Sequence, residues 1–98
     1  MRTKNDYINI LKSRSDELKQ QFGIRSLRLF GSVARNEQKE TSDVDICVET
    51  ETPNPFLLVR MKNYLEKLLG CSVDIIRTHK NMNEFLKQQI EKDGIYVF

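Results

Sequence analysis

Two aspartates, Asp43 and Asp45, flank Val44 in a stretch that reads DVDICVE from residue 43 to residue 49. Apolar and polar residues alternate there with a period of two, which predicts a β-strand. Side chains two positions apart on a strand share one face, with Cα atoms about 6.5 Å apart, so both carboxylates could bind a hard cation such as Mg²⁺. The wet face of a half-buried strand carries the same residues, and for this pair alone that second interpretation is the stronger.

A third acid, Asp74, stands between Val73 and Ile75 in another stretch that is predicted to be a strand. Aspartate is disfavoured inside strands, so its presence there calls for a reason. If the two strands are neighbours, the three carboxylates would crowd together and repel one another unless cations neutralise them. One solvated acid on the strand is the alternative.

Gly31 and Ser32 follow the apolar residue Phe30 and precede a possible helical turn. Glycine lacks a Cβ, so its backbone can approach a phosphate closely. A helix start would point free N–H groups at the same anion, and the Ser32 hydroxyl could donate as well. By itself Gly-Ser is most often only a turn.

The elements that must position these residues follow from the apolar spacing and from the turn residues. We predict the order helix, strand, short helix, strand, helix, strand, helix, over residues 5–22, 26–30, 33–35, 43–49, 56–69, 72–76 and from about 85 to just before 94. Asn5 or Asp6 is the predicted N-cap of the first helix, which Gly23 ends. The apolar tail at residues 95–98 fits a sheet edge, an interface or a strand that caps the core. The expected fold is a single α/β domain over residues 1–98, with a small mixed sheet flanked by helices.

Composition limits the classes of function. The chain is 39% hydrophobic and 31% charged with a net charge of +2, which is typical of a globular domain and offers no concentrated basic face. We therefore expect no nucleic-acid partner, although a nucleotide ligand stays compatible with this charge. No apolar run approaches the roughly 18 residues of a membrane span and no signal peptide is recognisable, so a cytoplasmic protein is expected. Cys47 and Cys71 are expected to be reduced thiols, with a disulfide between them left open.

The joint arrangement is more specific than any of its parts. Gly31-Ser32 follows an apolar residue, ten residues intervene, and Asp43-Val44-Asp45-Ile46 follows on a strand. This arrangement resembles the signature of the DNA polymerase β-like nucleotidyltransferase superfamily. The whole run GSVARNEQKETSDVDICVE, including Arg35 and Ser42, is similar to the minimal nucleotidyltransferase (MNT) family, and the resemblance extends over nearly the whole chain.

The departures from that family pattern are small. Many members have a small residue at the position of Asn36, and Leu or Val at the positions of Ile46 and Cys47. None of these differences removes one of the three acids.

The resemblance implies a polymerase β-like palm fold and transfer of a nucleoside monophosphate, AMP from ATP, to an acceptor hydroxyl. Phosphoryl transfer requires positioning and charge neutralisation, which bound Mg²⁺, two ions by resemblance, would provide. Asp74 would also help to deprotonate the attacking hydroxyl. Arg35 is either a phosphate partner or a surface arginine. The implied metal ligands are Asp43, Asp45 and Asp74, and the implied phosphate-binding residues are Gly31, Ser32 and Arg35. His79, alone in a polar loop, is expected to be solvated.

The small size implies that the acceptor is held by something else, either a second copy of the chain or a partner protein. The MNT family implies a helical HEPN partner, with this chain as the antitoxin that adenylylates a tyrosine of the HEPN toxin. One alternative is a non-catalytic antitoxin that neutralises its partner by contact and whose metal site is vestigial. Another is transfer to a small molecule or an RNA end. The sequence leaves the acceptor, the base preference, the number of metals and the oligomeric state open.

Overall fold

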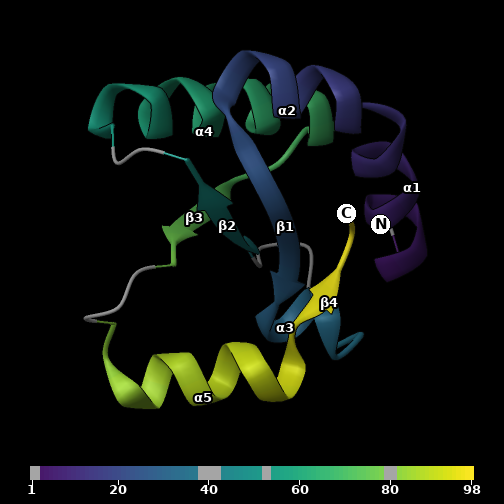
Figure 1. Ribbon diagram of the computed structural model, residues 1–98. Coiled ribbons are helices and arrows are strands. Elements are labelled where there is room, and N and C mark those ends of the chain that lie inside the picture. Colours follow the sequence, from purple (N-terminus) through teal and green to yellow (C-terminus); the bar gives the residue numbers. More distant parts are fainter. Residues whose placement is uncertain (1–2, 38–42, 52–53, 79–81) are drawn as a thin grey trace.

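Helices and strands alternate along the chain in the computed structural model (Figure 1), which describes residues 3–37, 43–51, 54–78 and 82–98. The elements are α1 (Lys4–Ser13), α2 (Ser15–Phe22), β1 (Ile24–Phe30), α3 (Gly31–Ala34), β2 (Val44–Thr50), α4 (Pro55–Leu69), β3 (Val73–Arg77), α5 (Glu84–Asp93) and β4 (Ile95–Tyr96). Apart from the first predicted helix, which is divided into α1 and α2, the predicted order of elements is therefore confirmed, with each strand shifted or extended by one or two residues.

The strands of the described residues form one sheet in the order β3-β2-β1-β4. β2 and β3 run parallel, whereas β1 is antiparallel to both β2 and β4. The parallel pair is joined through α4, which supplies the crossover that parallel strands need. The predicted mixed sheet flanked by helices is thus confirmed.

The two faces of the sheet carry cores of different size. Leu27 and Leu29 of β1 and Ile46 of β2 are fully buried in a large cluster that includes residues of α1, α2 and α4. On the opposite face, Phe30 and Cys47 pack with Ile90 of α5 in a smaller cluster. Figure 1 shows α2 and α4 on one side of the sheet and α5 on the other. The sheet face toward α5 is therefore the less covered one.

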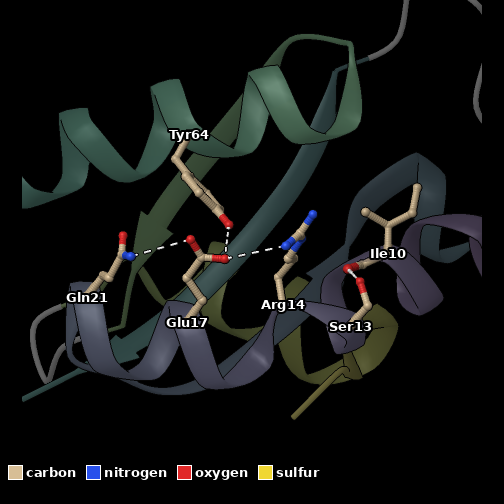
Figure 2. Close-up of polar contacts among 6 residues, drawn as sticks. All are labelled: Ile10, Ser13, Arg14, Glu17, Gln21 and Tyr64. Atoms are coloured by element: carbon tan, nitrogen blue, oxygen red, sulfur yellow. Dashed lines mark hydrogen bonds and ion pairs between the residues drawn. The ribbon is translucent and has the colours of Figure 1, made fainter.

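The predicted first helix is wrong in two respects. It is broken into α1 and α2 at Arg14, and its N-cap is Thr3, because the Thr3 hydroxyl accepts from the Asp6 N–H while the Asp6 carboxylate accepts from the Thr3 N–H. At the break, the Ser13 hydroxyl donates to the Ile10 carbonyl over 2.6 Å (Figure 2). This local bond competes with continuation of the helix.

A partly buried hydrogen bond joins α2 to α4. The Tyr64 hydroxyl donates to Glu17 over 2.8 Å, and Gln21 and Arg14 also contact the Glu17 carboxylate (Figure 2). Burial and the bond to Glu17 raise the pKa of Tyr64. The Glu17 carboxylate therefore links α2 to α4.

The apolar tail forms the sheet edge, one of the options left open by the sequence. Ile95 pairs with Leu29 of β1. The N–H of Val97, which is buried, donates to the Leu27 carbonyl, and the Leu27 N–H donates to the Phe98 carbonyl. Both cysteines are free. In the part of the chain that the structure describes, no helix is long and apolar enough to cross a membrane.

Candidate functional site

The sheet register places two of the predicted acids side by side. Asp45 of β2 lies opposite Asp74 of β3 in the parallel pair, and it also lies opposite Phe30 of β1 in the antiparallel pair. In-register residues of adjacent strands point to the same face. Asp45 is half-buried, whereas Asp74 and Asp43, which immediately precedes β2, are exposed. The strands that carry Asp45 and Asp74 are therefore neighbours, which the sequence analysis stated only as a condition.

The electrostatics of Asp45 reflect this crowding. Burial raises the pKa of the Asp45 carboxyl, and the charges of Asp74 and Asp43 raise it further, while the positive charge of Arg35 lowers it. The other two acids thus both act on the Asp45 carboxylate. A proton or a cation bound there would relieve the cost of the negative charge.

Gly31 explains how the chain passes so close to this carboxylate. Its φ is +72°, a left-handed conformation that glycine adopts without steric cost. A Cβ placed on Gly31 would lie 3.0 Å from Cγ of Asp45 and closer still to its Oδ2. The end of β1 and the start of α3 can therefore contact Asp45 only because residue 31 has no side chain.

A cavity of about 470 Å³ gathers most of the predicted residues. Five of the six line it, and Asp43 does not, although its charge reaches Asp45. The five residues are Gly31, Ser32, Arg35, Asp45 and Asp74. The volume is within the range of roughly 300–1,000 Å³ that is usual for small-ligand sites.

The sequence analysis did not identify the contribution of α5 to this cavity. Leu86, Gln89 and Asp93 of that helix also line it. Nothing local in the sequence brings α5 to the ends of β2 and β3. One signal was available for Asp93, because an acid in the last turn of a helix opposes the helix dipole and needs a compensating partner.

That partner is Arg35. Its Nη1 lies 2.8 Å from Asp93 Oδ2 and its Nε lies 3.0 Å from Glu37 Oε2. The hydrogen bonds to Glu37 and then to Asp93 raise the pKa of the Arg35 guanidinium. Arg35 is therefore an exposed, ion-paired residue at the cavity wall, and its role as a phosphate partner stays a prediction.

Carboxylate oxygens are the ligands that Mg²⁺ prefers, so the donor set of Asp45, Asp74 and the adjacent Asp43 fits this ion chemically. The raised pKa of Asp45 is consistent with a site that awaits a positive charge. Within the described ranges, however, no three Asp, Glu, His or Cys side chains are gathered closely enough to form a ready metal-binding group. The three-aspartate metal site stays a prediction.

Other predicted features fall elsewhere. Ser42 and His79 lie outside the described residues. A second cavity of about 380 Å³, lined in part by Arg28, Arg77 and Lys87, borders α5 and contains none of the predicted site residues.

Comparisons with known proteins found similar sequences and similar folds. Residues 11–97 match the family described as the nucleotidyltransferase domain. The protein adenylyltransferase MntA of Thermococcus cleftensis is 40% identical over 98 residues, an alignment that covers 99% of this chain and 98% of that protein.

Solved structures share the fold, among them the following two. One, described as a toxin–antitoxin with AMP-PNP, has a TM-score of 0.74 at 22% identity and covers 89% of this chain and 72% of its own. The other, a tri-AMPylated Shewanella oneidensis HEPN toxin in complex with an MNT antitoxin, has a TM-score of 0.67 at 19% identity and covers 93% of this chain and 71% of its own. At these identities the likeness concerns the fold alone.

Proposed function

This chain belongs to the nucleotidyltransferase domain family and is a minimal nucleotidyltransferase, and from that premise we propose that it transfers AMP from ATP to a tyrosine of a helical HEPN-type toxin. In this proposal Mg²⁺ assists the transfer and the chain acts as the antitoxin. The observation that carries the proposal is the in-register pair Asp45 and Asp74, with the Asp45 carboxylate packed against Gly31, in a cavity that Arg35 also lines.

The proposed reaction is a displacement at the α-phosphorus of ATP. The acceptor oxygen forms a bond to that phosphorus, the bond to the bridging oxygen of the β-phosphate breaks, and pyrophosphate leaves. Asp74, which is exposed at the cavity, takes the proton of the acceptor hydroxyl. AMP is then esterified to the acceptor, and the proton passes from Asp74 to solvent.

The remaining residues hold the triphosphate and its metal. Gly31 permits close approach of the phosphates, Ser32 donates its hydroxyl, and Arg35 offers guanidinium N–H groups at the same wall. Asp45, Asp74 and Asp43 would hold Mg²⁺. When bound, this ion neutralises charge on the phosphate oxygens and on the leaving pyrophosphate.

Three comparisons support the choice of nucleotide and acceptor. The relative with 40% identity is named a protein adenylyltransferase, and the HEPN toxin bound to one structural neighbour carries AMP groups. The AMP-PNP in another neighbour supports ATP as the donor. The cavity lies on the α5 side of the sheet, and in this proposal the partner protein presents its tyrosine hydroxyl there.

The experiment is transfer of label from α-labelled ATP with Mg²⁺ to a co-purified HEPN-type partner. Wild type is compared with the double variant Asp43→Asn/Asp45→Asn and with Glu49→Gln, which removes an exposed carboxylate from the same strand outside the cavity. We expect label on a partner tyrosine with wild type and Glu49→Gln only. If wild type transfers nothing from any of the four NTPs while the double variant still neutralises the toxin, the chain is an antitoxin that acts by contact.

A further inference from the structure

Arg35 is held by carboxylates on two of its three guanidinium nitrogens. Nε donates to Glu37 and Nη1 donates to Asp93. Among the described residues Nη2 has no partner, so its two N–H donors stay available. Because the side chain lines the same cavity as Asp45, those donors can serve an anionic group bound there.

The two carboxylates that hold Arg35 are not equivalent. The bond to Glu37 makes the larger contribution to the raised pKa of Arg35, yet the Glu37 side chain is 66% exposed and lies only two residues away along the chain. The Asp93 side chain is 16% exposed and belongs to a different element, α5. Solvent screens the exposed pair much more, so the fixed orientation of Arg35 depends chiefly on Asp93.

Asp93 itself has a fixed position. Ile90, three residues earlier, is 2% exposed, and its carbonyl accepts from the Gly94 N–H over 2.7 Å. Any Cβ on Gly94 would overlap that carbonyl, so the chain turns tightly just after Asp93. Ile95 then pairs with Leu29 of β1. Asp93 is therefore anchored to the sheet from both sides.

The position of Asp93 allows the ion pair with Arg35 but is unfavourable for the helix itself. Asp93 is the last residue of α5, where the helix dipole disfavours a negative charge. Lys92 beside it is the kind of residue that this end favours. The contact with Arg35 supplies the compensation.

We propose that Asp93 is a positioning residue, which holds Arg35 so that Nη2 faces the phosphates of a nucleoside triphosphate in the cavity of Gly31, Asp45 and Asp74. This inference rests on the proposed function and extends it to α5. A free arginine loses considerable rotamer freedom when it binds an anion, and an arginine that is already clamped loses less. The clamp therefore improves affinity for the nucleotide and leaves the chemical step to the aspartates.

The test measures the Kd of the chain for AMP-PNP with Mg²⁺ by calorimetry, and the KM and kcat for ATP with a HEPN-type partner. We expect Asp93→Asn to raise Kd and KM about three- to tenfold, with kcat changed less than about twofold. Asp93→Glu restores the carboxylate and should recover most of the affinity. Glu91→Gln, which removes an exposed acid from the same helix, should leave Kd unchanged.

A double-mutant cycle separates positioning from a structural role. In an Arg35→Ala background, Asp93→Asn should have no further effect on Kd, because its partner is gone. The proposal is overturned if Asp93→Asn binds AMP-PNP as tightly as wild type or more tightly, or if it weakens binding equally in both backgrounds. Thermal melting checks that each variant folds, and Arg35→Lys, which keeps the charge without Nη2, should match the affinity of Asp93→Asn. The binding measurement stands even if no acceptor is ever labelled, so the two proposals fail separately.

Discussion

Asp45 and Asp74 lie opposite each other on the parallel strands β2 and β3, with Gly31 packed against the Asp45 carboxylate. This relationship joins the electrostatics of the site to the stability of the fold. Two acids on adjacent strands repel each other, and the close contact at residue 31 leaves Asp45 little room to move away. The pair therefore lowers stability in the free protein and creates an affinity for positive charge.

The first prediction concerns pH. Folded Asp45 binds its proton more tightly than the unfolded chain does, because burial and then the charges of Asp74 and Asp43 raise its pKa. The free energy of unfolding should therefore fall as pH rises from about 4, the ordinary aspartate pKa, through the raised pKa of the folded state. At pH values above the raised pKa, Asp45 causes no further change in the free energy of unfolding. Asp45→Asn removes the charge, so it should be more stable than wild type at pH 8 and nearly equal at pH 4.

Urea denaturation in metal-free buffer at a series of pH values checks this. Glu49→Gln is the matched control, because it removes a carboxylate from the same strand and the same sheet face away from Asp74. An equal difference between wild type and Asp45→Asn at pH 4 and pH 8 would contradict the assignment to this carboxyl.

A second prediction concerns Gly31→Ala. The left-handed conformation costs an alanine about 1–2 kcal/mol, and its Cβ forces the Asp45 carboxylate away from its place. A misplacement on this scale should lower kcat/KM for ATP about 100-fold. Gly23→Ala has a similar φ of +65° but open space around its Cβ, so it should show the stability cost with transfer intact. Equal activity of the two alanine variants would disprove the role of the contact.

The sequence predicted the local features of this site and missed its long-range ones. The period of two in residues 43–49 was enough to orient Asp45, and the Gly-Ser turn was recognisable from residue type. The register that sets Asp45 beside Asp74 depends on the crossover through α4, which no local pattern fixes. The contact of Arg35 with Asp93 joins positions 58 residues apart, so only the unusual acid at a helix end hinted at it.

The break between α1 and α2 was missed for a related reason. Leu11 and Leu18 are both fully buried and lie seven residues apart, a spacing that also fits one continuous helix. The interaction at the break is the local bond from the Ser13 hydroxyl to the Ile10 carbonyl. A side-chain hydrogen bond to the backbone of this kind is hard to recognise in a sequence pattern, although it competes with the helix in the structure.

A third prediction tests the link between α2 and α4 shown in Figure 2. Tyr64→Phe removes the donor to Glu17 and should lower the free energy of unfolding by about 1 kcal/mol. Since burial and Glu17 raise the pKa of Tyr64, this contribution is fully present below about pH 10 and is lost as pH rises through the raised value.

Tyr96→Phe, at a residue that is 63% exposed, is the control and should change stability little. Label transfer should be unaffected in both, because neither residue lines the site cavity; a loss of transfer in Tyr64→Phe would mean that the angle between α2 and α4 affects the site.

The last prediction follows from the repulsion between Asp45 and Asp74. If these carboxylates hold Mg²⁺, the ion binds the folded chain in preference to the unfolded one and stabilises it by about 1.4 kcal/mol when its concentration is ten times the Kd. The melting temperature of wild type at pH 8 should therefore rise with Mg²⁺, and addition of EDTA should reverse the rise. Asp45→Asn starts from a higher stability without metal, because its repulsion is already relieved, and should gain little from Mg²⁺. NaCl at matched ionic strength separates specific binding from screening, which acts on both proteins alike. An equal gain from Mg²⁺ in wild type and in Asp45→Asn would place the ion elsewhere and would remove Asp45 from the metal site.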